Sequence, residues 1–115
     1  MSKTLSNTQL ERLIGLVAIG LSVALEEDHL SPDEAAHLLF SPATMRLLEG
    51  QDADRSLVSL VHDGTEVDDV SRLAPEGLSL LLAKIRKAGL ATLKTADTYD
   101  FQETKWLEIL LSPDP

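Results

Sequence analysis

The chain has 115 residues, a length that suits one domain with a hydrophobic core of its own. With 43% hydrophobic and 25% charged residues, its composition is that of a globular protein and excludes a disordered chain. The formal net charge of -9 argues against nucleic acid and anionic membranes as partners, because both attract proteins through lysine and arginine. The absence of cysteine excludes disulfides, thiol nucleophiles and cysteine-ligated zinc.

The first predicted element is a long helix over residues 6–27. Ser6 followed by Gln9 has the form of a capping box, which marks a helix start. The apolar residues after it point in nearly every direction around the axis, so we expect a helix buried on most sides, with Gly15 and Gly20 close to a neighbouring helix. The apolar run within it, about thirteen residues, is too short to span a bilayer, and its flanks do not fit a signal peptide. We therefore expect a cytoplasmic protein.

Two Ser-Pro units predict the next two helices. Ser31 and Ser41 each offer a capping hydroxyl, followed by proline at the first helical position. The second of these helices should end at Gly50, a residue suited to the left-handed position after a helix. Phosphorylation by a proline-directed kinase is the alternative interpretation, but the flanking residues already require helix starts. We expect the first helix to turn three apolar side chains inward: Ala35, Leu38 and Leu39.

A further helix is predicted to begin at Asp52 or Asp54 and to end at residues 63–64, with one buried face formed by Leu57, Val58, Leu60 and Val61. The Asp-Gly pair at that end is also a strong hairpin signal when it lies between apolar runs. A helix should follow it instead, starting with Thr65 as N-cap and Asp68 at the capping-box position. The reason is that the downstream apolar residues recur every three positions rather than every two: Val67, Val70 and Leu73.

Pro75 opens the last long helix, which we expect to run to about Lys94. Most of its leucines, together with its isoleucine, fall on one stripe about a third of the circumference wide, as in a helix that packs on a core. Leu80 and Leu90 fall off that stripe. These two leucines are therefore expected on the surface.

The C-terminal part of the chain is less clearly patterned. Residues 95–102 are typical of a loop, and residues 103–111 fit either a short helix or an edge strand. Residues 1–5 and 112–115 are expected to be tails. The whole chain, residues 1–115, is thus predicted to be one all-α domain, a compact bundle of five to seven helices around a buried N-terminal helix.

The acidic octet HDGTEVDD, residues 62–69, is the densest group of chemically interesting side chains. It lacks the alternating oxygen ligands and distal glutamate of a calcium loop, and the chain has no His-Glu-x-x-His zinc motif. It also lacks a Gly-x-Ser-x-Gly nucleophile elbow and a glycine-rich phosphate loop. We therefore predict no catalytic residue, no cofactor and no metal site, and a protein that is not an enzyme.

Charge is distributed unevenly along the sequence. Residues 26–34 carry five acids and no base, and residues 49–76 carry eight acids against two bases, whereas residues 77–94 carry four bases and no acid. An acidic surface speeds encounters with a cationic protein and solubilises the chain. We expect a basic protein partner, with these carboxylates as the contacts: Glu49, Asp52, Asp54, Asp63, Glu66, Asp69 and Glu76.

Three segments carry a resemblance to small helical bacterial proteins. They are Ser31-Pro32-Asp33-Glu34-Ala35-Ala36, Phe40-Ser41-Pro42 and Gly64-Thr65-Glu66-Val67-Asp68-Asp69. In this layout the chain resembles immunity proteins of contact-dependent growth inhibition systems. The resemblance implies a cytoplasmic inhibitor that binds a secreted toxin domain, typically a basic nuclease, and covers its active site by charge complementarity.

A second class of function remains open. Apolar residues off the core stripes could serve as an interface, namely Leu80, Leu90 and Trp106. The protein would then be a homodimeric regulatory or secretion-chaperone-like module.

Overall fold

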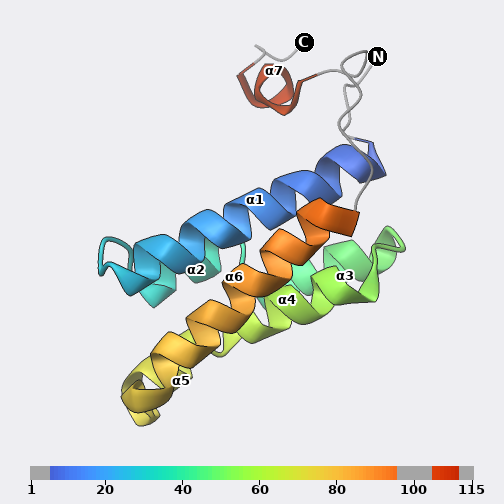
Figure 1. Ribbon diagram of the computed structural model, residues 1–115. Helices are drawn as coiled ribbons and strands as arrows, with labels where there is room; N and C mark the ends of the chain where they lie inside the picture. The colour runs from blue at the N-terminus through green and yellow to red at the C-terminus, as the bar shows by residue number, and fades with distance from the viewer. Residues whose placement is uncertain (1–5, 96–104, 112–115) are drawn as a thin grey trace.

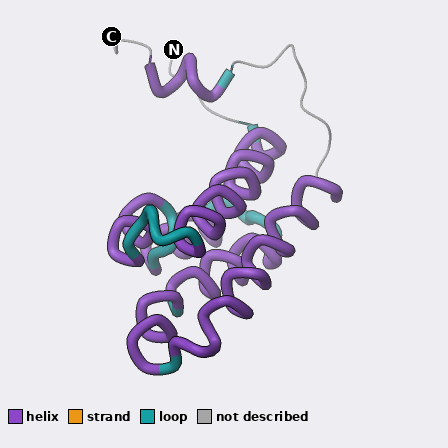
Figure 2. Tube along the Cα trace, turned by 60° about the vertical axis from the view of Figure 1, so that its left-hand side comes forward, coloured by secondary structure: helices purple, strands orange, loops and turns teal. Residues whose placement is uncertain are grey.

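The computed structural model describes residues 6–95 and 105–111, and within these ranges every regular element is a helix (Figures 1 and 2). The predicted all-α fold is confirmed. The expected tails at residues 1–5 and 112–115, and residues 96–102 of the expected loop, lie outside the described residues. In chain order the elements are α1 (Asn7–Glu26), α2 (Pro32–Leu38), α3 (Pro42–Gly50), α4 (Arg55–Thr65), α5 (Val67–Leu73), the 3-10 turn η1 (Pro75–Gly77), α6 (Leu78–Thr95) and α7 (Trp106–Leu111).

The first three helices begin at the predicted serine caps. Ser6 Oγ accepts a hydrogen bond from the Gln9 amide at 3.2 Å, and Gln9 Oε1 accepts one from the Ser6 amide at 3.4 Å, which completes the capping box. Ser31 and Ser41 accept bonds from the amides three residues further on, at 3.1 and 3.2 Å. Each such cap stabilises its helix by about 1 kcal/mol.

The pair of α1 and α6 forms the most extensive helix contact, and the two lie side by side in both views (Figures 1 and 2). They approach closely where Gly15 meets Gly89. A Cβ at Gly15 would lie 3.1 Å from the Gly89 carbonyl oxygen, and one at Gly89 would lie 2.9 Å from the Gly15 oxygen. The predicted close approach is thus confirmed at Gly15. It is wrong at Gly20, which is exposed and where an added Cβ would meet no atom of the described residues within 4 Å.

One side of α1, next to its contact with α6, remains open. Leu16 is 52% exposed and Val23 is 43% exposed, so the expectation of a helix buried on most sides is too strong for this side. By length and composition alone α1 is long and apolar enough to span a bilayer. Of its most apolar stretch of 18 residues, 39% is buried inside the fold. A core helix passes the same test, so the compartment stays a prediction.

Helix α4 carries its predicted apolar face into the core, with Leu57, Leu60 and Val61 buried and Val58 partly buried. Its C-terminal end differs from the prediction. The helix continues through Gly64, and Thr65 is not an N-cap, because its hydroxyl donates to the His62 carbonyl at 2.6 Å. α5 follows directly, with no capping bond from a side chain, so Asp68 does not complete a capping box.

Two smaller expectations also fail. Leu38 is 57% exposed, because the short helix α2 turns only Ala35 inward and Leu39 is buried just beyond it. α3 does end at Gly50, but this glycine stays helical and Asp52 takes the left-handed conformation instead, with φ 56.

Helix α6 follows its predicted stripe, with Leu82 and Ile85 fully buried and with Leu80 and Leu90 exposed as expected. The open choice at the C-terminus is settled for residues 106–111, which are helical. This helix, α7, lies near the N-terminal half of α1 (Figures 1 and 2).

Candidate functional site

An open groove of about 630 Å³ runs between α3 and α4, and we call it the α3–α4 groove. Three partly buried apolar side chains, Met45, Ala53 and Val58, belong to it and pack against the core beneath. Polar and charged side chains complete the lining. The residues of the groove are Met45, Glu49, Asp52, Ala53, Arg55, Val58, Ser59 and His62.

The carboxylates of Glu49 and Asp52 are exposed at this groove, and among the described residues neither makes an ion pair. Glu66 joins them indirectly, because its Oε1 lies 3.4 Å from Nδ1 of His62, which lines the groove. Arg55 is the only guanidinium that the described residues place in the lining. Three carboxylates against one guanidinium give this area a net charge of about -2 when His62 is neutral.

The backbone holds Asp52 in an unusual conformation. Its φ of 56 lies in the left-handed region, which glycine adopts freely and which costs other residues up to about 1–2 kcal/mol, less for aspartate. The turn is closed by the Ala53 amide, which donates to the Leu48 carbonyl at 3.0 Å. A carboxylate therefore stands at the groove where a glycine would fit the backbone at lower cost.

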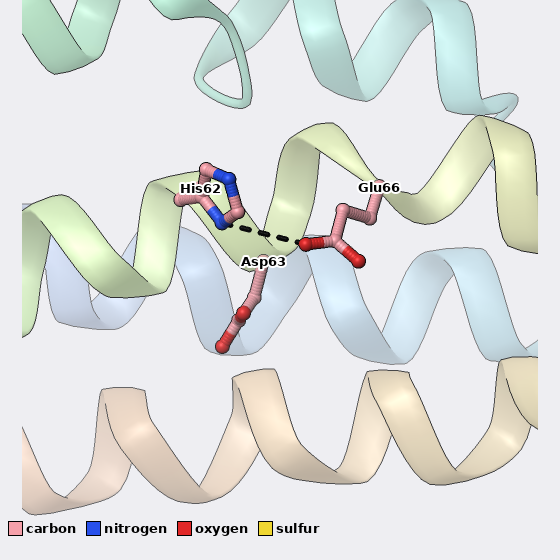
Figure 3. Close-up of side chains that lie close together, drawn as sticks. All are labelled: His62, Asp63 and Glu66. Carbon is pink, nitrogen blue, oxygen red and sulfur yellow. Dashed lines mark ion pairs between the residues drawn. The ribbon is translucent and has the colours of Figure 1, made fainter.

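His62, Asp63 and Glu66 present ligand atoms that all lie within 4.8 Å of one another. Figure 3 shows that Asp63 points away from the other two, toward α6. There Lys84 Nζ lies 3.5 Å from Asp63 Oδ2, and the Asp63 side chain is only 13% exposed. Because an ammonium group this close repels a second cation, we assign no metal site to this cluster.

The other predicted carboxylates have local roles elsewhere. Asp54 caps α4, and hydrogen bonds from the backbone and side chain of Ser56 lower the pKa of its carboxyl. Asp69 pairs with Arg72 at 2.7 Å, alongside a pair of Asp68 with Arg72 at 3.3 Å. Exposed Glu76 lies in η1. Of the seven predicted contacts, the fold thus gathers three near the α3–α4 groove: Glu49, Asp52 and Glu66.

Comparison with known proteins adds one finding. The family model described as Protein of unknown function (DUF3969) matches residues 5–108, which is most of the chain. The chain belongs to the DUF3969 family. No curated protein and no solved structure matches it. The function of this DUF3969 protein is therefore inferred from its own side chains.

The lining contributed by α4 was missed at the level of sequence, although a signal was present. Arg55, Val58 and His62 recur at helical spacings of three and four, so they lie on one side of α4, next to its buried face. That side of α4 begins at Arg55, about one helical turn after Asp52. The spacing therefore places the α4 lining close in sequence to the acidic residues that follow α3.

Proposed function

We propose that this DUF3969 protein is a non-enzymatic binding protein, and most concretely an immunity protein that neutralises a basic, nuclease-type bacterial toxin in the cytoplasm. The α3–α4 groove carries the proposal, because it combines an apolar lining with the exposed carboxylates of Glu49 and Asp52. A nuclease cleft holds lysine and arginine to bind phosphates. Such side chains can lay their aliphatic stems on the apolar lining and direct their charges at the two carboxylates.

The charge of the whole chain supports the same partner. A net charge of -9 attracts a cationic protein over a long range and can raise the association rate by roughly 10 to 10³. The attraction is screened by salt. The proposal therefore implies fast binding at low ionic strength, with slower association as salt is added.

The test uses the toxin domain encoded by the gene adjacent to that of this protein. The double variant Glu49→Lys with Asp52→Lys should associate more slowly with that domain, show a flatter salt dependence and fail to protect cells that express it. The control, Asp33→Lys with Glu34→Lys, makes the same change in net charge on α2, away from the groove. Equal loss in both variants would reject the groove as the contact, and a wild-type protein without protective effect would reject the immunity function.

A second candidate is a regulatory or secretion-chaperone-like module that docks through apolar surface. The observation in its favour is the exposure of Leu80 and Leu90 on α6, at 78% and 54%. On this hypothesis Leu80→Glu abolishes partner binding and the Glu49→Lys, Asp52→Lys variant retains it. The immunity hypothesis predicts the reverse result.

A further inference from the structure

The open side of α1 has apolar residues in its middle and opposite charges at its ends. Positions 12, 16, 20, 23 and 27 are separated by three or four residues, so they follow one side of a helix. We call this set the α1 outer strip. Its members are Arg12, Leu16, Gly20, Val23 and Glu27.

The apolar part of the strip is available for contact. Leu16 and Val23 are exposed, and so is Gly20 between them. A Cβ at Gly20 would meet no atom within 4 Å, so no part of the described fold requires a glycine there. Glycine destabilises the middle of a helix, and the close approach of another helix is a common reason for its presence.

The N-terminal end of the strip opens into a groove of about 440 Å³ between α1 and α7. α1 supplies Leu13 and Leu16, and α7 supplies Trp106 and Leu107 as the opposite wall. Two cations, Arg12 and Lys105, also line it. The groove thus suits an apolar side chain that is followed closely by a carboxylate.

The strip itself offers such a pair, since Val23 is followed one helical turn later by Glu27. We propose that a second copy of this chain binds the α1 outer strip in an antiparallel orientation, with Val23 and Glu27 of each copy in the groove between α1 and α7 of the other. The midpoint between Leu16 and Val23 along α1 lies between residues 19 and 20, and the midpoint between Arg12 and Glu27 lies at the same place. One two-fold axis at that point therefore brings Leu16 against Val23 of the other copy and Arg12 against Glu27 of the other copy.

The charges at the two ends favour this orientation over a parallel one. Arg12 Nη1 donates to the Leu93 carbonyl at 3.2 Å, which holds the guanidinium at the groove while leaving it further N–H donors. Glu27 is exposed and makes no ion pair among the described residues. An antiparallel pair places Glu27 of one copy by Arg12 and Lys105 of the other, whereas a parallel pair places like charges together.

The exposed leucines of α6 do not offer an equivalent surface for a second copy. Lys84 and Lys87 lie between Leu80 and Leu90 and line the same shallow pocket as Leu80. A two-fold contact there would bring lysines against their copies. The α1 outer strip has no cation in its apolar middle, and Gly20 lets two helices approach closely at the axis.

Sedimentation over a range of concentrations tests the proposal. We expect the 12.5 kDa chain to reach twice that mass as its concentration rises, more readily in moderate salt, which screens the repulsion between two chains of charge -9. Gly20→Glu should remain monomeric at every concentration. Gly50→Glu is the matched control, because a Cβ at Gly50 would also meet no atom of the described residues within 4 Å, and it should dimerise as wild type does. A monomeric wild type, or a dimer unaffected by Gly20→Glu, overturns the proposal.

Cross-linking tests the orientation, since the chain contains no native cysteine. Mixing Leu16→Cys with Val23→Cys chains under mild oxidation should give a disulfide-linked pair, whereas either variant alone should give several-fold less. Efficient linkage within each single variant would indicate a parallel pair and overturn the antiparallel arrangement. Because the strip shares no residue with the α3–α4 groove, these results are independent of toxin binding.

Discussion

The ring of Phe40 packs directly on Gly64, so closely that a Cβ at Gly64 would overlap the ring. Phe40 is buried and belongs to the turn between α2 and α3, and Gly64 lies in the last turn of α4. The backbone of Gly64 is not left-handed, so the glycine is required for space and not for its conformational freedom. This contact holds the turn that precedes α3 against α4. The two helices α3 and α4 form the two sides of the α3–α4 groove.

Replacing Gly64 by alanine should therefore destabilise the protein. Alanine is favoured over glycine inside a helix by about 1 kcal/mol, but the new methyl group must displace a buried ring, and such overpacking typically costs ~1–3 kcal/mol. We expect a net loss in the free energy of unfolding, measured by urea denaturation. Gly50→Ala, which adds the same group in open space, should show no loss. Equal stabilities of the two variants would mean that the ring can move aside at little cost.

The features that sequence predicts well are those whose chemistry is local. The caps at Ser6, Ser31 and Ser41 each involve an amide three residues away, so the motif contains both partners of the bond. The spacing of apolar residues on α4 and α6 likewise identified the buried faces and the exposed Leu80 and Leu90.

The end of α4 could not be predicted in the same way. Residues 63–64 are typical of a helix end or a turn, because aspartate and glycine favour both. Gly64 stays inside the helix and packs against Phe40, a residue distant in sequence, and packing of this kind can override local preference. The α3–α4 groove was missed for a related reason, since it forms only when two helices and the turn after Gly50 are brought together.

The ion pair of Asp63 with Lys84 should contribute to stability, because the carboxylate is only 13% exposed. Lys84 itself is 68% exposed, so solvent screens the pair and we expect Lys84→Gln to cost roughly 0.5–1 kcal/mol. Lys87→Gln on the same helix is the control and should cost less, because Lys87 makes no ion pair among the described residues. Combining Lys84→Gln with Asp63→Asn should recover part of the loss, and additive effects would show that the pair is not coupled.

Asp54 makes the stability depend on pH in a defined direction. Hydrogen bonds from Ser56 lower its pKa in the folded state, so the charged carboxylate stabilises the fold above its unfolded pKa, and this contribution is lost as pH falls through the folded pKa. Asp54→Asn keeps a good N-cap without the titrating group. The melting temperature of wild type should exceed that of the variant at neutral pH, and the difference should shrink as the pH falls below the usual pKa of an aspartate. A melting-temperature difference that stays constant with pH would show that it comes from the shape of the side chain at position 54 and not from its charge.

Asp52 allows binding to be separated from folding. Asp52→Gly removes a carboxylate at the α3–α4 groove and also relieves a left-handed aspartate, so the free energy of unfolding should stay level or rise by up to about 1 kcal/mol. Association with the toxin domain should nevertheless slow. Asp28→Gly is the matched control, since Asp28 has φ 61 after α1 and does not line the groove.

Urea denaturation and association kinetics, measured on both variants, separate the structural role of Asp52 from its role in binding. We expect Asp28→Gly to gain similar stability and to bind as wild type does, once both rates are compared at the same ionic strength. A loss of stability in Asp52→Gly alone would show that its carboxylate supports the turn after α3. An association rate of Asp52→Gly equal to that of wild type would show that the Asp52 carboxylate does not contribute to binding. The conformational cost of its left-handed backbone would then not be explained by recognition of the toxin domain.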